Sequence, residues 1–152
     1  MKISVELVKQ LREKTQASIA ECRKALEEAK GDLKTAEQVL KKKGFEAAIA
    51  KSERKTGQGL VEAYVHQNGK VGALVELLCE TDFVARTVEF KTLAHEIAMQ
   101  VAAMNPKDIE TLLKQEYIRD ASKTIEALIK ETIAKLGENI VLKGFSRLEI
   151  GE

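Results

Sequence analysis

The side chains that could carry acid–base or nucleophilic chemistry are few in this 152-residue chain. Three acids, Glu76, Glu80 and Asp82, lie close together in the sequence, and paired carboxylates can act as general acid and base. Isolated acids beside a strand are, however, usually surface charges. The two histidines, His66 and His95, lack a nearby serine or cysteine nucleophile with a supporting acid. We therefore expect no covalent catalysis.

Signals for a bound phosphate or metal are also weak. A phosphate-binding glycine loop opens a helix, whereas Gly57-Gln58-Gly59 precedes a predicted strand. Cys22 and Cys79 are far apart in sequence and lie in apolar surroundings, which is typical of small buried side chains in a reducing, intracellular setting. We expect no metal site, no cofactor and no direct nucleotide binding.

The most informative stretch is Glu80–Arg86, which connects a continuously apolar run, Val71–Cys79, to a helical pattern. Connections run over the protein surface. A phenylalanine in such a place allows two interpretations. Phe83 can fold back onto the core while Thr81 or Asp82 caps the following helix. Alternatively, Phe83 projects as an aromatic anchor for a partner's pocket, with Asp82 as its charged neighbour.

Composition restricts the class of protein. With 44% hydrophobic and 32% charged residues, the chain is typical of a globular protein. The 25 basic and 24 acidic residues nearly cancel, unlike the basic excess of a nucleic-acid-binding protein. Met1-Lys2-Ile3-Ser4 begins no long apolar segment, so we expect no signal peptide, no membrane contact and a cytoplasmic location.

Residues 4–43 have the pattern of three short helices. Ser4 can cap the first, and Ser18 with Glu21 has the form of a capping box at the start of the second. The third is expected to end at Gly44. This predicts a helical module over residues 1–45, followed by a basic linker helix over 46–58. The lysines and arginine of the linker form a solvated face, or meet an acidic partner or nucleic acid.

The sequence pattern of residues 59–152 predicts an α+β core. In the first strand, from Leu60 to His66, apolar and polar residues alternate, and Asn68-Gly69 is a strong hairpin signal. A helix to about Met104 follows, then a helix capped by Ser122, and a last strand over 140–150. We expect a three-stranded antiparallel sheet covered by helices on one side.

Several of these stretches resemble one family. Thr81–Arg86, with the sequence TDFVAR, resembles the core signature of elongation factor Ts. Thr15–Leu26 resembles the ubiquitin-associated-type head of that family, although Gln16 and Ser18 replace glycines and Ile19-Ala20 replaces a methionine pair. Further similarity covers the Tyr64–His66 strand and the final segments Gly137–Ile140 and Phe145–Glu149, so the resemblance spans nearly the whole chain.

The resemblance implies a guanine-nucleotide exchange factor for elongation factor Tu. The loop Thr81, Asp82, Phe83 and Val84 would enter the GTPase domain near its magnesium, so that GDP leaves without any bond being made or broken. Leu11, Arg12, Ile19 and Ala20 of the head would add contacts to the partner. Ile19 also fits a core position equally well, because apolar residues at helical spacing usually face inward.

Larger members of the family carry a second core copy and a helical insert, where this chain has a short connection between Pro106 and Tyr117. A homodimer would supply the absent copy, and Tyr64 and His66 of one protomer would then contact elongation factor Tu. These two residues can also form a plain solvated strand face. The alternative function is a helical protein-interaction or RNA-associated adaptor without exchange activity, supported by the head and the basic linker.

Overall fold

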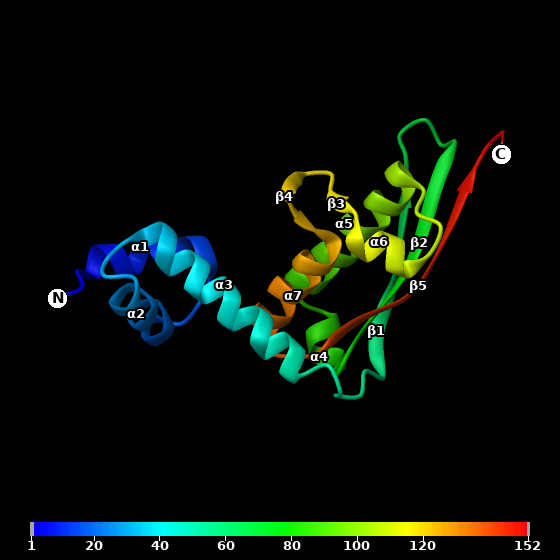
Figure 1. The fold of residues 1–152 in the computed structure, drawn as a ribbon. Helices are drawn as coiled ribbons and strands as arrows, with labels where there is room; N and C mark the ends of the chain where they lie inside the picture. The colour runs from blue at the N-terminus through cyan, green and yellow to red at the C-terminus, as the bar shows by residue number, and fades with distance from the viewer. Residues whose placement is uncertain (1, 152) are drawn as a thin grey trace. The chain divides into compact units, whose positions relative to one another are not determined.

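The computed structural model describes residues 2–151, and the chain divides into two units, Met1–Ile49 and Ala50–Glu152. The first unit holds α1 (Val5–Thr15), α2 (Ile19–Glu28) and most of α3 (Leu33–Ala50) (Figure 1). No helix in the described part of the chain combines the length and the apolar character that a bilayer crossing requires.

The predicted caps of the first two helices are confirmed. The Ser4 hydroxyl accepts a hydrogen bond from the Leu7 amide at 3.3 Å. Ser18 and Glu21 form a complete capping box, in which each side chain accepts a bond from the other residue's amide. Between these helices Gln16 has a φ of 60°, the left-handed conformation in which glycine is favoured.

The core of the first unit is small. Its members are fully or almost fully buried and come from all three helices; they are Leu11, Cys22, Ala25, Leu26, Ala29 and Ala36. Three of these six are alanines, so the helices approach one another closely around two leucines. Much of the remaining apolar surface is only partly covered, as expected of a module with so few residues.

The expected break at Gly44 was wrong, because α3 continues through Gly44 and Phe45 to Ala50. A glycine inside a helix costs about 1 kcal/mol relative to alanine, which favourable neighbours can offset. Lys43 forms a 2.8 Å ion pair with Glu28, and the Lys41 ammonium lies 5.7 Å from the centre of the Phe45 ring. The predicted linker helix is therefore the second half of α3, and it ends at Ala50 rather than at residue 58.

The second unit contains the predicted three-stranded antiparallel sheet, confirmed with the order β1-β2-β5. Its strands are β1 (Gln58–Val65), β2 (Val71–Cys79) and β5 (Ile140–Glu149). The hairpin turn lies at Asn68-Gly69, where Gly69 has a φ of 69°. Gly59 allows the close approach of β1 to β2, since a Cβ there would lie 2.1 Å from the carbonyl oxygen of Leu77.

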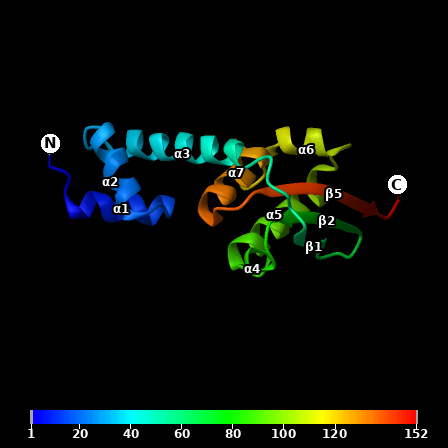
Figure 2. The same ribbon diagram turned by 90° about the horizontal axis from the view of Figure 1, so that it is seen from below.

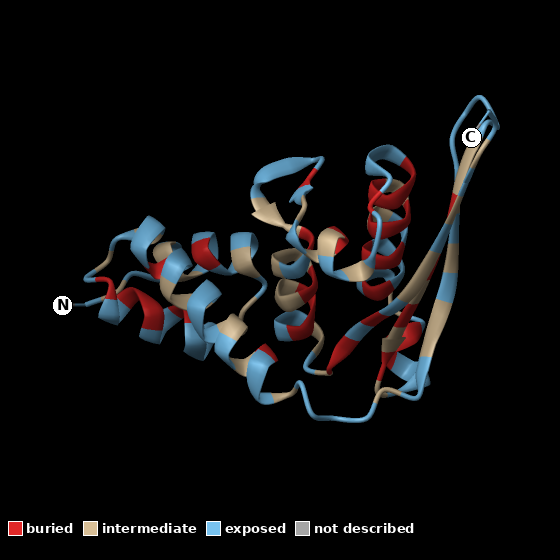
Figure 3. Cartoon of the chain, turned by 45° about the vertical axis from the view of Figure 1, so that its right-hand side comes forward, coloured by how far each residue is buried: buried red, intermediate tan, exposed pale blue. Residues whose placement is uncertain are grey.

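Helices cover one face of this sheet (Figures 1 and 3). The main cover is α5 (Val88–Met104), with α7 (Ile125–Leu136) packed against it and the short α6 (Ile109–Lys114) beside them. The core between the layers consists of buried apolar residues of β2, α5, α6 and α7; the largest include Val75, Leu77, Phe90, Ile97, Val101, Leu112 and Ile125.

The other face of the sheet is uncovered and apolar. Val61, Val65 and Leu74 lie exposed on it, and Leu148 of β5 is 81% exposed. Tyr64 of β1 faces α5 instead, where its ring makes an edge-to-face contact with His95. The alternation within β1 therefore directs its polar side toward the helices and its valines outward.

A second, two-stranded hairpin was not predicted. It consists of β3 (Glu116–Tyr117) and β4 (Asp120–Thr124). The expected cap Ser122 was wrong: it lies in β4, where its hydroxyl donates to the Asp120 carboxylate. Thr124 caps α7 by accepting from the Ala127 amide at 3.1 Å, because the turn around Asp120 leaves the chain extended for two further residues.

Buried polar contacts hold this hairpin against α5. The Gln100 side chain is fully buried, donates to the Glu116 carbonyl at 3.0 Å and accepts from the Ile118 amide at 3.0 Å. The Tyr117 hydroxyl donates to Glu96 at 2.8 Å, and Arg119 pairs with the same carboxylate at 2.7 Å. Each strand is too short to be stable alone, so these contacts determine its place.

The Tyr117 phenol is expected to ionise late. Burial, followed by the hydrogen bond to Glu96 and the charge of that carboxylate, raises the pKa of Tyr117 from 10.0 to about 12. The phenol therefore contributes stability that is complete below pH 10 and is lost as pH rises toward 12. Ultraviolet absorbance of tyrosinate should show an ionisation near pH 12 that Tyr117→Phe removes; an unchanged curve in the variant would contradict the assignment.

Candidate functional site

The stretch after β2 forms a one-turn helix, α4 (Asp82–Ala85), rather than a plain connection (Figure 2). Thr81 caps it by accepting a hydrogen bond from the Val84 amide at 3.3 Å. Thr87 caps α5 in the same way by accepting from the Phe90 amide at 3.2 Å. Two threonine caps six residues apart thus begin two successive helices and fix a sharp corner at the end of the central strand.

The side chains of α4 divide between inside and outside. Val84 and Ala85 are buried against the core, whereas Phe83 is 82% exposed. The interpretation that Phe83 folds back onto the core was therefore wrong. Val84 was expected to contact a partner, but its burial makes it the residue that fixes α4 to the core. A fully projecting phenylalanine leaves about 1.5–3 kcal/mol of apolar burial available to a partner.

Charges beside Phe83 are also accessible. Asp82 forms an ion pair with Arg86 at 2.8 Å, and both side chains are more than half exposed. Exposed pairs of this kind contribute less than about 1 kcal/mol, so a partner can break the pair at small cost. Val88, in the first turn of α5, is 75% exposed and was not singled out from the sequence. The available signal was its position outside the buried stripe of α5.

A residue far along the sequence holds the start of α4 in place. Glu138, in the turn between α7 and β5, accepts hydrogen bonds from the Glu80 and Thr81 amides at 3.2 and 3.0 Å. Its second oxygen accepts from the Thr81 hydroxyl at 2.7 Å. No sequence pattern predicts this contact, beyond the family-like segment that contains Glu138, because 57 residues separate Glu138 from Thr81.

The acids that could have formed a catalytic pair have structural partners instead. Glu80 accepts from the Asn139 amide at 2.8 Å and lies 3.5 Å from the Arg54 guanidinium. Glu76 lies 3.8 Å from Lys143. Within residues 2–151, no group of three or more His, Cys, Asp or Glu side chains is arranged to hold a metal ion.

The thiol nearest α4 is not a reactive group. Cys79 is fully buried, and its Sγ lies 3.1 Å from the Thr81 carbonyl, to which it donates. Burial, and after it the negative charge of Glu138, raises the pKa of the Cys79 thiol. Because the thiolate is the nucleophilic form, this environment lowers the reactivity of Cys79.

The predicted contact residues of the head fall into two groups. Leu11 is fully buried in the core of the first unit, so its assignment as a contact residue was wrong. Arg12 and Ala20 are exposed, and Ile19 is 59% exposed at the start of α2. The core position considered for Ile19 was therefore also wrong, and its side chain is accessible.

Tyr64 and His66 lie at the hairpin end of β1, whereas α4 follows the opposite end of β2 (Figure 1). The Tyr64 hydroxyl and His66 Nδ1 are 3.1 Å apart, and His66 is exposed. The Val65–Gly72 and Gln58–Cys79 pairs mark the two ends of this ladder. A single chain therefore does not bring Tyr64 and His66 together with Phe83.

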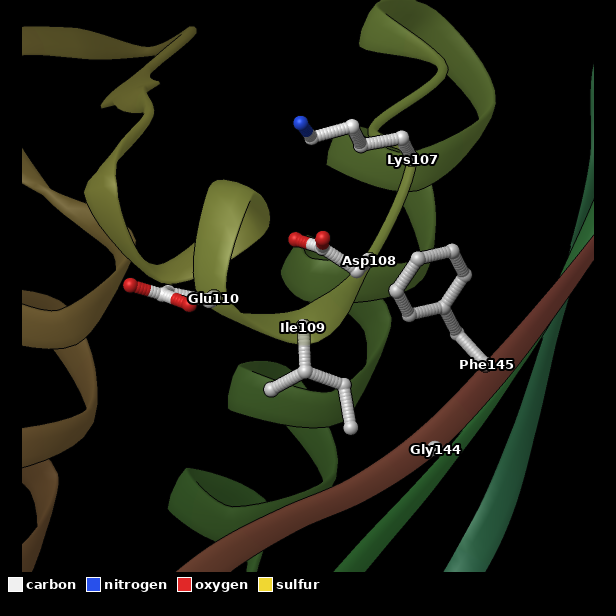
Figure 4. A pocket seen from close by; sticks show the side chains of 6 residues that line it. All are labelled: Lys107, Asp108, Ile109, Glu110, Gly144 and Phe145. Atoms are coloured by element: carbon white, nitrogen blue, oxygen red, sulfur yellow. The ribbon is translucent and has the colours of Figure 1, made fainter.

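A shallow hollow of about 540 Å³ lies between α6 and β5 (Figure 4). It is lined by Lys107, Asp108, Ile109, Glu110, Gly144 and Phe145. The Asp108 carboxylate already accepts a hydrogen bond from the Thr111 amide at 2.7 Å, and the hollow is wide open. None of its lining residues belongs to α4, so it is not part of the candidate site.

An exposed aromatic on a fixed one-turn helix is the feature of this unit best suited to contact with another macromolecule. Comparison with known proteins identifies the family. The sequence model described as Elongation factor TS matches residues 80–152, which include both α4 and Glu138.

Full-length relatives are similar over the whole chain. Elongation factor Ts of Coprothermobacter proteolyticus is 45% identical over 197 aligned positions that cover 100% of both chains. Elongation factor Ts of Thermoanaerobacter pseudethanolicus is 43% identical, covering 99% of this chain and 96% of the relative. The protein of the same name from Thermotoga maritima is 43% identical, covering 100% and 98%. The chain belongs to the elongation factor Ts family of translation elongation factors.

Because Leu11 is buried and Ile19 is exposed, replacing each side chain with alanine should affect stability to different extents. Leu11→Ala should destabilise the first unit by about 2–5 kcal/mol, because it opens a cavity in a small core. Ile19→Ala should change stability by less than about 0.5 kcal/mol, as is usual at exposed positions. Amide hydrogen exchange of α1 and α2 in the full chain measures both; equal protection in the two variants would contradict the assigned burial.

Proposed function

We propose that this protein is a guanine-nucleotide exchange factor for elongation factor Tu. The observation that carries the proposal is the projection of Phe83 from a helix whose other side is buried. Its relatives are named elongation factor Ts, and the resemblance to that family supports nucleotide exchange on elongation factor Tu as the activity. Its place of action would be the cytoplasm, where ribosomes use elongation factor Tu.

The proposed mechanism is displacement by α4. Phe83 would occupy a pocket of the GTPase domain near its magnesium, and Asp82 would bring a negative charge close to the metal and phosphates. These contacts would shift the groups that hold GDP, so that the nucleotide dissociates. Binding is reciprocal: if the factor weakens GDP binding, GDP weakens binding of the factor by the same amount. The step forms and breaks no covalent bond.

The head would add affinity through its accessible residues. Arg12, Ile19 and Ala20 form the part of the predicted set that is exposed. Ile19 offers the larger apolar area, whereas Ala20 contributes little. We assign Leu11 a supporting role, because its burial holds α1 in place.

Phe83→Ala should reduce the rate of GDP release from elongation factor Tu by about thirty- to a thousandfold, since an aromatic anchor contributes about 2–4 kcal/mol. The melting temperature should be unchanged, because the ring is 82% exposed. Release of labelled GDP and circular dichroism measure the two quantities. Normal exchange in the variant would refute the assignment of Phe83.

Asp82→Asn in the same assay provides the comparison. It retains the size of the side chain and removes its charge, together with the ion pair to Arg86. We expect a smaller decrease in the rate of GDP release than for Phe83→Ala, since accessible charges act mainly on the association rate and on orientation. An equal loss would make Asp82 the principal group that disturbs the magnesium site.

We also propose that the protein acts as a homodimer through the uncovered face of its sheet. The face carries Val61, Val65, Leu74 and Leu148, all exposed in the single chain. Apolar patches of this kind mark interaction surfaces. A second copy would supply the core copy present in larger members of the family, and would place its own Tyr64 and His66 near the partner bound by Phe83.

Light scattering tests the dimer. The wild-type chain should have twice its mass of 16.8 kDa, and Leu74→Glu should be monomeric because it introduces a charge at the centre of the uncovered face. Val88→Glu, the same kind of change at an exposed site on α5, should remain dimeric. A wild-type monomer that exchanges nucleotide at full rate would exclude the dimer requirement.

A further inference from the structure

The helix that carries Phe83 is too short to define its own orientation. A helix of four residues has barely one turn of backbone hydrogen bonds, and isolated helices of that length do not form. Burial of Val84 and Ala85 holds one side of α4. Its beginning lies beyond the last sheet pair, Cys79–Ile140, so the neighbouring strand no longer supplies acceptors there.

Glu138 supplies these acceptors. One carboxylate oxygen accepts from the amides of Glu80 and Thr81, and the other accepts from the Thr81 hydroxyl. A hydroxyl has one hydrogen. Because that hydrogen is given to Glu138, a lone pair of the Thr81 oxygen faces the Val84 amide, which donates to it at 3.3 Å. The carboxylate is thus connected through Thr81 to the amide of the residue after Phe83.

Other bonds fix the position of Glu138 itself. The neighbouring Asn139 amide donates to Glu80 at 2.8 Å, so the two segments exchange bonds in both directions. The Asn139 side chain is buried and donates to the carbonyls of Ser52 and Arg54 at 3.3 and 3.0 Å. The Arg54 guanidinium also pairs with Glu80. Three segments of the unit therefore meet at the start of α4.

We propose that Glu138 is a positioning residue for nucleotide exchange, which holds Thr81 and thereby directs Phe83 toward elongation factor Tu. The inference rests on the proposed function, because it assigns a supporting role to the same site. The Glu138 carboxylate is a charged acceptor, and hydrogen bonds to ionised groups are about twice as strong as those between neutral groups.

Glu138→Gln tests the proposal. Glutamine has the same shape, but an NH₂ group replaces one carboxylate oxygen, so either the two backbone amides or the Thr81 hydroxyl loses its acceptor. GDP release should be about ten- to a hundredfold slower at equal folded concentration, the equivalent of one lost charged hydrogen bond. Amide hydrogen exchange over residues 81–86 should also be faster in the free variant. Glu126→Gln on α7, whose acid forms an exposed pair with Lys130, is the matched control and should match the wild type in both measurements.

A double-mutant cycle separates positioning from general stability. Phe83→Leu retains an apolar side chain and should leave measurable exchange. If Glu138 acts by directing residue 83, the double variant should lose less than the product of the two single losses. Losses that multiply, or Glu138→Gln with wild-type exchange rate, would overturn the proposal. Absence of GDP release with the wild-type protein would instead refute the proposed function, while hydrogen exchange at α4 would still show whether Glu138 holds the helix.

Discussion

The exposed phenylalanine depends on a helix that cannot be stable by itself. Fixing each residue of α4 costs about 1–2 kcal/mol of backbone entropy, and a single turn returns few hydrogen bonds. The order of α4 is therefore supplied from outside, by two buried side chains, a threonine cap and the carboxylate of Glu138. The sheet, α5 and the α7–β5 turn all contribute to that support. The aromatic ring itself contributes nothing to it and remains available.

This arrangement separates stability from function among adjacent residues. Val84 and Ala85 belong to the core, whereas Asp82 and Phe83 of the same turn point into solvent. Asp82 also forms only an exposed ion pair. Substitutions of Asp82 or Phe83 can thus change the exposed surface without altering the fold. Such separation suits a protein whose activity is the shape it presents to another protein.

Local patterns in the sequence predicted much of the fold. The β2 strand, the Asn68-Gly69 hairpin and the capping box at Ser18 depend on neighbouring residues, and all appear as expected. Gly44 was misjudged because helix breaking by glycine is weak and the surrounding lysines and alanines outweigh it. The β3–β4 hairpin was missed because its position depends on Gln100 and Glu96 of a distant helix.

The position of the corner that carries Phe83 was predicted, but the contacts that support it were not. The TDFVAR stretch marks the corner, but only packing decides that Phe83 points outward while Val84 points inward. The same limit applies to Leu11, whose helical spacing is compatible with core or surface until the three helices are packed together. Glu138 acts on residues 57 positions away. No pattern in a local window contains that information, since it depends on how the chain returns to the sheet.

Burial of both native thiols makes the protein suitable for site-specific labelling. Cys22 lies in the core of the first unit and Cys79 beneath the start of α4, and neither is accessible to solvent. A cysteine introduced on the surface would therefore react with a maleimide dye far faster than either native one. A fluorophore could be attached near α4 without first removing the natural cysteines. The surroundings of that helix could then be followed directly in the otherwise unaltered chain.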